Sequence, residues 1–319
     1  MLRLAFHPPA ASATFQGGLL PFAAAVNQAL GEAAIELCPE GVLGGKLMTQ
    51  LALIESGGAD AAFVIPGFTP ERFPDNFVFG IPGLFRDIAE ASLVFARVVA
   101  AGKLRGYEDF FVIGAFCTEP FSLHARKKLT CLADLKGMRL RAANKADEIM
   151  LKQLGADARI VPGDKILSSI EDGMIDGTTL HAGPLYDLGI ARITSYDYFL
   201  RLGCAPLTVL MTKDRFARLA SKVQDAIRAY SGEWFAARYA GHVAAHNAVL
   251  LAKMRGDPNR TVIEPPVEEI AAAEAAFVPI VETWLAEHPR NWQTLVAVKD
   301  EIARLQAQRA APVEQRPAK

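Results

Sequence analysis

The sequence predicts an α/β protein with two domains. Short apolar segments alternate with segments of helical periodicity, and the 319-residue chain is long for a single core. A second series of turn, strand and helix follows Phe121, after the first series is complete. Alternation of this kind is typical of a mostly parallel sheet with helices on both faces.

The first series begins at the N-terminus. Apolar residues recur at helical spacing between Phe15 and Leu30, and Pro21 either kinks this helix or marks its true start. In chain order we expect strands and helices to alternate, with strands at 3–7, 34–38, 61–65 and 110–116 and helices at 14–30, 46–56 and 88–105.

The second series leads back to the first domain through a strand at 206–211. Residues 213–254 contain no proline, so we expect one continuous helix, which at 1.5 Å per residue would extend about 60 Å and cross both domains. Two helices should follow over 267–308, and residues 309–319 are expected to be disordered. The chain therefore divides into lobe I (1–118 and 206–248) and lobe II (119–205 and 249–308).

Composition excludes several functions. The formal net charge is −1, which provides no basic surface for nucleic acid. No apolar run reaches the length of a membrane span, and the first residues are typical of a strand rather than a signal peptide. No C-x-x-C pair occurs, although a disulfide between other cysteines stays open. His242 and His246 have metal-ligand spacing, but no third ligand is evident, so we expect no metal or cofactor.

The segment 134–141 contains the strongest candidate for a binding residue. It is typical of a tight turn followed by a short strand that ends on Arg141. An arginine there directs its planar fork out of the sheet edge, where a carboxylate can accept two parallel hydrogen bonds. Arg139 lies two residues earlier on the same face, and we expect it to be a solvated or inter-element charge. The alternative for Arg141 is a surface salt bridge.

Several segments resemble the solute-binding subunits of TRAP transporters, the tripartite ATP-independent periplasmic transporters, of the dicarboxylate-binding-protein type. The similarity extends from Leu2 to about Arg304. The segments that carry it occur in the order and spacing of the family: 39–45 (PEGVLGG), 70–74 (PERFP), 81–85 (IPGLF), 134–141 (DLKGMRLR), 161–162 (VP) and 173–177 (GMIDG).

The resemblance implies a two-lobed fold of the periplasmic-binding-protein type with a long helix that connects the lobes. It implies that Arg141 binds the carboxylate of a small organic acid between the lobes, and that a membrane permease receives the ligand. It also implies a periplasmic protein whose signal peptide is absent from this sequence, whereas the sequence alone equally permits a cytoplasmic protein.

Polar residues that follow the first strands are candidates for the ligand site, because ligands of open α/β sheets bind beyond the carboxyl ends of strands. His7 and Ser12 follow the first strand; the alternative is a capping serine beside an ordinary surface histidine. Phe68 and Thr69 follow the strand at 61–65. Phe68 either closes over a ligand or packs against neighbouring phenylalanines.

Three more candidates lie in the second domain. His124 is either a ligand contact or a satisfied core histidine. Thr179 and His181 follow the Asp-Gly turn, where the best-known family members have Glu-Asn and use the asparagine to contact substrate. Here Thr179 and Leu180 stand instead, so a sialic-acid or C4-dicarboxylate specificity does not carry over.

These residues favour a monocarboxylate ligand with an apolar or hydroxylated remainder, because each further buried carboxylate would need its own cation. The alternative function is an enzyme on a two-lobed scaffold, with His124 or His181 as a general base. A third possible function is the effector domain of a regulator. Such proteins carry a helix-turn-helix segment, which this sequence lacks.

Overall fold

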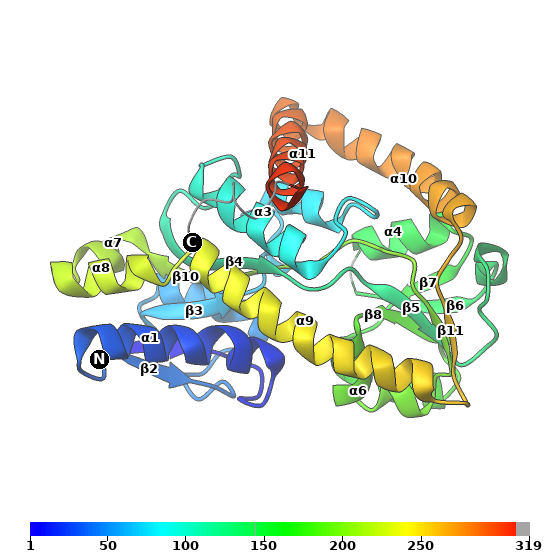
Figure 1. Ribbon diagram of the computed structural model, residues 1–319, viewed down its shortest axis with the longest axis horizontal. Coiled ribbons are helices and arrows are strands. Elements are labelled where there is room, and N and C mark those ends of the chain that lie inside the picture. The colour runs from blue at the N-terminus through cyan, green and yellow to red at the C-terminus, as the bar shows by residue number, and fades with distance from the viewer. Residues whose placement is uncertain (144, 311–319) are drawn as a thin grey trace.

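The computed structural model describes residues 1–143 and 145–310 and shows two α/β lobes side by side (Figure 1). Lobe I contains a sheet of order β2-β1-β3-β10-β4, in which β10 runs antiparallel to its neighbours. Its strands are β1 (Leu2–Ala5), β2 (Ile35–Cys38), β3 (Ala61–Val64), β4 (Phe110–Cys117) and β10 (Pro206–Thr212). The mixed α/β class is therefore confirmed, and β10 returns to the first lobe as expected.

Lobe II contains a sheet of order β11-β9-β5-β8-β6-β7. The strands β6, β7 and β8 are parallel, and β5 is antiparallel to β8 and β9. The strands of this sheet are β5 (Ser122–Ala125), β6 (Arg139–Ala142), β7 (Asp157–Ile160), β8 (Gly177–Leu180), β9 (Tyr196–Tyr198) and β11 (Thr261–Ile263).

Helices cover both faces of the lobe I sheet. Alternate residues of each strand face opposite sides, so Leu4 and Val209 belong to one core and Ala5 and Leu210 to the other. The first core is completed by α1 (Leu20–Leu30), α8 (Ser221–Ala229) and α9 (Glu233–Gly256), and the second by α2 (Gln50–Glu55), α3 (Ile88–Ala100) and α11 (Pro289–Ala310).

The lobe II sheet is covered in the same way, by two smaller cores. Leu140 faces a core shared with α4 and α10, and Leu180 faces a core shared with α5, α6 and the end of α9. These helices are α4 (Lys145–Gln153), α5 (Ile166–Glu171), α6 (Ala182–Asp187) and α10 (Val267–Glu287).

The segment that follows β10 differs from the single helix expected at 213–254. It forms α7 (Lys213–Ala217), α8 and α9. The break before α9 lies at Gly232, which has a φ of 62° and donates its N–H to the carbonyl of Ile113 in β4. Few other residues adopt this φ, so the tertiary contact ends α8 without a proline.

The helix α9 nevertheless crosses both lobes (Figure 1). Its 24 residues extend about 36 Å. It approaches β4 closely near its start, because a Cβ on Gly114 would lie 2.7 Å from the ring of Phe235. At its other end Met254 is buried in a lobe II core. One helix is thus embedded in both lobes.

Other predicted elements agree closely with the structure. A π-helical turn at Phe15–Leu19 precedes α1. Pro21 lies in the first turn of α1, so the proline marks the start of the regular helix. The two C-terminal helices are confirmed as α10 and α11. We expected both in lobe II, but α11 packs on α3 of lobe I. The predicted disorder beyond residue 310 lies outside the described residues.

Candidate ligand-binding site

The carboxyl ends of β6, β7 and β8 lie at one edge of the lobe II sheet, because these strands are parallel. Arg141 stands near the end of β6, in register with Arg159 of β7 and Thr178 of β8. Val161 follows β7, and His181 follows β8. Loops at this edge of an open α/β sheet are where ligands bind.

Arg141 is a half-buried cation at this edge. Its Nε donates a hydrogen bond to the carbonyl oxygen of Val161 over 3.0 Å. Its two terminal nitrogens form no hydrogen bond or ion pair with a residue in the described part of the chain. Burial lowers the pKa of the Arg141 guanidinium, and the negative field of Asp147 opposes this shift. A carboxylate from outside the chain is the chemical complement of such a fork.

Arg139, two residues earlier, has the opposite environment. Its Nε and one terminal nitrogen bind the two carboxylate oxygens of Asp176, at 3.0 and 2.7 Å. Lys127 and Arg126 also lie beside this carboxylate, whose side chain is fully buried. Burial alone would raise the pKa of Asp176, but hydrogen bonds from Arg139 and Lys127 and the charge of Lys127 hold it well below its usual value. The expectation of an inter-element charge at Arg139 is confirmed.

In lobe I, polar atoms gather at the carboxyl ends of β1 and β3. His7 follows β1, Thr69 follows β3, and the side chain of Gln50 at the start of α2 is almost fully buried. Each has a buried polar atom without a hydrogen-bond partner among the described residues: Nδ1 of His7, Oγ1 of Thr69 and Oε1 of Gln50. Sequence reasoning missed Gln50, because a glutamine in a short helix gives no signal.

A strained residue lies beside these atoms. Glu40 has a φ of 59°, the one positive φ of a non-glycine residue in residues 1–143 and 145–310. Its N–H donates to the carbonyl of Pro8. The following Gly41 also has a positive φ, and a Cβ there would lie 2.9 Å from Nδ1 of His7. The turn after β2 is thus held tightly against His7.

The other two lobe I candidates are less enclosed. The Oγ of Ser12 accepts a hydrogen bond from the N–H of Phe15 over 3.4 Å, which is the capping alternative. Phe68 is 41% exposed and forms no ring pair with Phe73, which packs instead on Tyr107. An exposed aromatic side chain beside Thr69 is available to a ligand.

His124 lies in a buried polar network. Its Nδ1 is 2.7 Å from Oδ1 of Asp197, and its Nε2 is 3.2 Å from the carbonyl oxygen of Leu180. Arg260 binds both carboxylate oxygens of Asp197. His124 is 1% exposed, so both ring nitrogens are used within the core. The structure therefore favours the core alternative, and His124 is not carried into the proposed site.

His181 and Thr179 are placed differently from each other. His181 is the residue before α6, and its ring stacks on Phe121 with the centroids 6.0 Å apart. Burial, and the neighbouring His124, lower the pKa of His181 to about 4. Thr179 lies within β8, opposite Leu123 of β5, and is 2% exposed. His181 thus belongs to the strand-end edge, and Thr179 lies one step inside it.

Asn247 of α9 is a polar residue that sequence reasoning missed. It is 1% exposed and belongs to the buried stripe that contains Ala240, Val243 and Met254. Neither of its amide atoms has a hydrogen-bond partner among the described residues. A polar residue at an apolar position of a helical pattern was the available signal.

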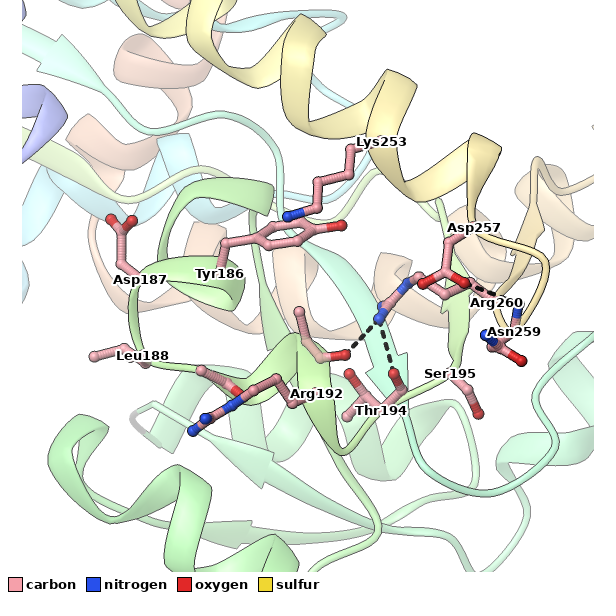
Figure 2. Close-up of a pocket in the computed structure, with 12 residues that line it drawn as sticks. Tyr186, Asp187, Leu188, Arg192, Thr194, Ser195, Lys253, Asp257, Asn259 and Arg260 are labelled. Carbon is pink, nitrogen blue, oxygen red and sulfur yellow. Dashed lines mark hydrogen bonds between the residues drawn. The ribbon is translucent and has the colours of Figure 1, made fainter.

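A cavity of about 760 Å³ lies elsewhere on lobe II, below the end of α9 (Figure 2). Lys253 extends over the ring of Tyr186, and Arg260 donates to the carbonyls of Ala191 and Thr194. The guanidinium of Arg260 is therefore already occupied, unlike that of Arg141.

In the described part of the chain, no group of His, Cys, Asp and Glu residues is arranged to hold a metal, and no helix is long and apolar enough to cross a membrane. The four cysteines are free.

Solved structures share this fold. A marine metagenome TRAP solute-binding protein specific for aromatic acids, from an unidentified microbe, is 23% identical, with 95% of this chain and 98% of that chain covered and a TM-score of 0.84. A TRAP periplasmic solute-binding protein from Desulfovibrio salexigens is 21% identical over 98% of both chains, with a TM-score of 0.86. A TRAP solute-binding protein from Rhodoferax ferrireducens is 22% identical, covers 97% and 99%, and has a TM-score of 0.82.

Sequence comparison agrees with the structural comparison. An "uncharacterized protein" of Haemophilus influenzae is 25% identical over 202 residues, which are 62% of this chain; the match spans 61% of the length of that relative. The family model "Bacterial extracellular solute-binding protein, family 7" matches residues 7–288. That match includes both strand-end edges and Arg141, and the chain belongs to bacterial extracellular solute-binding protein family 7.

Proposed function

We propose that this protein is the periplasmic solute-binding component of a TRAP transporter. It binds a small organic acid between its lobes and delivers the acid to a membrane permease. The observation that carries the proposal is Arg141, a half-buried cation at a strand-end edge whose terminal nitrogens have no partner among the described residues. Half-buried guanidinium nitrogens without hydrogen-bond partners are costly, and a bidentate carboxylate supplies two charge-assisted hydrogen bonds to them.

The ligand class is a monocarboxylate. One arginine at the strand-end edge balances one carboxylate. The candidate side chains of lobe I, His7, Thr69 and Phe68, would add polar and aromatic surface rather than a second fixed cation. Proteins of the same fold support this class: they were solved with meta-hydroxyphenylacetate, benzoate and mandelate, each of which carries one carboxylate.

Binding would act through the relative position of the lobes. A ligand that touches Arg141 in lobe II and the polar atoms of lobe I binds more tightly when the lobes are closed. It therefore shifts the population toward the closed form by its difference in affinity for the two forms. The closed form is then the state that the permease recognises, and the ligand leaves chemically unchanged.

An enzyme has less support on this scaffold. Both ring nitrogens of His124 are occupied in the core. His181 has a pKa of about 4, well below the value near neutrality that suits a general base. Neither histidine is hydrogen-bonded to a serine, cysteine or lysine side chain in the described part of the chain, and the family is one of solute-binding proteins.

A thermal-shift screen of wild type, Arg141→Ala and Arg159→Ala tests the proposal. Arg159 is the register neighbour of Arg141 on β7 and pairs with Asp157 at the surface, so it controls for the loss of an arginine. A ligand at about 100 times its dissociation constant adds about 2.7 kcal/mol, which raises the melting temperature by several degrees.

We expect one class of acids to shift wild type and Arg159→Ala but not Arg141→Ala. Equal shifts in all three proteins would place the carboxylate site away from Arg141. The absence of any shift with benzoate, mandelate, lactate, glucuronate and succinate in wild type would contradict the proposed function. Mass spectrometry of the ligand before and after incubation shows whether it is altered, as an enzyme would alter it.

A further inference from the structure

The crossing point of α9 and α6 contains three polar atoms that the fold leaves without partners. They are Nδ1 of His181 and both amide atoms of Asn247, and all three are buried. A buried polar atom without a partner costs about 1–3 kcal/mol, so a fold that keeps three together leaves a large cost uncompensated. Asn247 could be leucine without loss of helical packing, because its neighbours on the stripe are apolar.

The three atoms belong to one small region. A Cβ placed on Gly183, in the first turn of α6, would lie 3.6 Å from Nδ1 of His181 and 3.8 Å from Oδ1 of Asn247. Glycine at this position keeps the space between the two side chains open. The ring of His181 is fixed there by its stacking on Phe121. The region therefore holds a donor-and-acceptor set with space beside Gly183 for a group about the size of a methyl.

We propose that Asn247 and His181 form a second subsite, which binds a hydroxyl group of the ligand and so selects hydroxylated monocarboxylates. The inference rests on the proposed function and deepens it. A hydroxyl donates one hydrogen bond and accepts others, which matches an amide that offers both a donor and an acceptor and a ring nitrogen beside it. An unsubstituted acid would leave these buried atoms unpaired.

The distance between the two subsites suits a small acid. Arg141 is in register with Thr178 of β8, and His181 lies three residues further along that chain. At about 3.3 Å per residue, His181 is roughly 10 Å beyond the Arg141 row. This spacing favours a ligand with its carboxylate and its hydroxyl on opposite sides of a ring or short chain over an acid with both groups on neighbouring atoms.

Glu119 makes the second subsite unsuited to a second carboxylate. It lies in the connection between β4 and β5, half-buried next to Asn247. Burial raises the pKa of the Glu119 carboxyl, and the nearby amide of Asn247 partly offsets the rise, although the two do not meet at hydrogen-bond geometry. A carboxylate on the ligand would meet this acidic group, whereas a hydroxyl would not be repelled.

Calorimetric titration of matched acid pairs tests the subsite. The probes are 4-hydroxybenzoate with benzoate, 4-hydroxyphenylacetate with phenylacetate, and 4-hydroxybutyrate with butyrate. The variants are Asn247→Leu, which continues the apolar stripe, and His181→Phe, which keeps the ring stacking and removes both nitrogens. The control is His246→Leu, which changes an exposed polar residue of the same helix.

We expect wild type and His246→Leu to bind the hydroxylated member of at least one pair about 10- to 100-fold more tightly. In Asn247→Leu and His181→Phe this ratio should fall to near 1, while the unsubstituted acid keeps its affinity. Binding of acids with no hydroxyl preference in wild type, or an unchanged ratio in both folded variants, would overturn the subsite and leave the proposed function standing. Failure of wild type to bind any of the six acids would overturn both.

Discussion

The two ends of β6 carry the same residue type in opposite circumstances. At the amino end, Arg139 is held by both oxygens of a buried carboxylate, with two further cations around it. At the carboxyl end, Arg141 has one backbone carbonyl as partner among the described residues. The first arrangement is complete within the chain and stabilises the lobe. The second leaves the terminal nitrogens without a partner in the part of the chain that the structure describes, and in the proposed function a ligand carboxylate binds them.

Replacing each of the two arginines with alanine, one at a time, is the most direct test of whether their roles differ. Arg141→Ala should weaken acid binding by at least about 100-fold, because it removes two charge-assisted hydrogen bonds and the balancing charge. Arg139→Ala should leave the affinity within about threefold. Titration calorimetry with the best acid from the screen measures both, and similar losses in the two variants would contradict the distinction.

Removing the carboxylate at the amino end should affect stability instead. Asp176→Asn leaves three cations around a neutral side chain and should lower the free energy of unfolding by about 2 kcal/mol, less than a fully buried pair would lose because the cations are partly exposed. Asp157→Asn, at an exposed ion pair, should change it by less than about 0.5 kcal/mol. Urea denaturation measures both changes. Equal unfolding midpoints for Asp176→Asn and wild type would show that Asp176 does not stabilise the fold.

The pH dependence of stability should also differ between the two edges. The pKa of Asp176 is depressed, so its contribution is present above the unfolded carboxyl pKa of about 3.9 and is lost as the pH falls below that value. The pKa of His181 is lowered to about 4 from about 6.5, so the unfolded chain takes up this proton first and stability falls as the pH drops from about 6.5 to 4.

The slope of the melting temperature between pH 6.5 and 4 separates the two residues. His181→Phe removes the second contribution and should flatten the decline by several degrees, while Asp176→Asn should leave the slope in this window almost unchanged. Parallel profiles for wild type and His181→Phe would show that His181 is not held neutral in the folded protein.

The smallest effect is expected at Thr179, one step inside the strand-end edge. Thr179→Asn restores the side chain that the best-known family members have near this position. It should change the ratio of affinities among acids by a few-fold, with the melting temperature within about 2 °C. An unchanged ligand profile in a thermal-shift panel would place Thr179 outside the pocket.

The fold was largely predictable from the sequence, because hydrophobic periodicity and turn residues determine where strands and helices lie. The break at Gly232 was not, since it depends on a hydrogen bond to Ile113 in a strand distant in sequence. The position of α11 was missed for a similar reason: nothing in its own amphipathic pattern says which lobe it covers.

The positions of the candidate site residues were predictable where they lie at the end of a strand or just after it. Arg141, His7, Thr69 and His181 all lie at carboxyl ends of strands, as the general rule for α/β sheets requires. His124 was ambiguous, because only the structure shows that both nitrogens are occupied. Asn247 was overlooked because α9 was regarded as a connector, although a polar residue in its apolar stripe was visible in the sequence.

The way α9 is held has a mechanical consequence. Near its start, Phe235 lies against Gly114 and Gly18 so closely that a single Cβ at either glycine would collide with the ring. The far end is buried in the other lobe. Because α9 is packed tightly at both ends, a rotation of lobe II relative to lobe I would have to bend the helix or displace one of these contacts. Domain closure and helix bending would then be coupled.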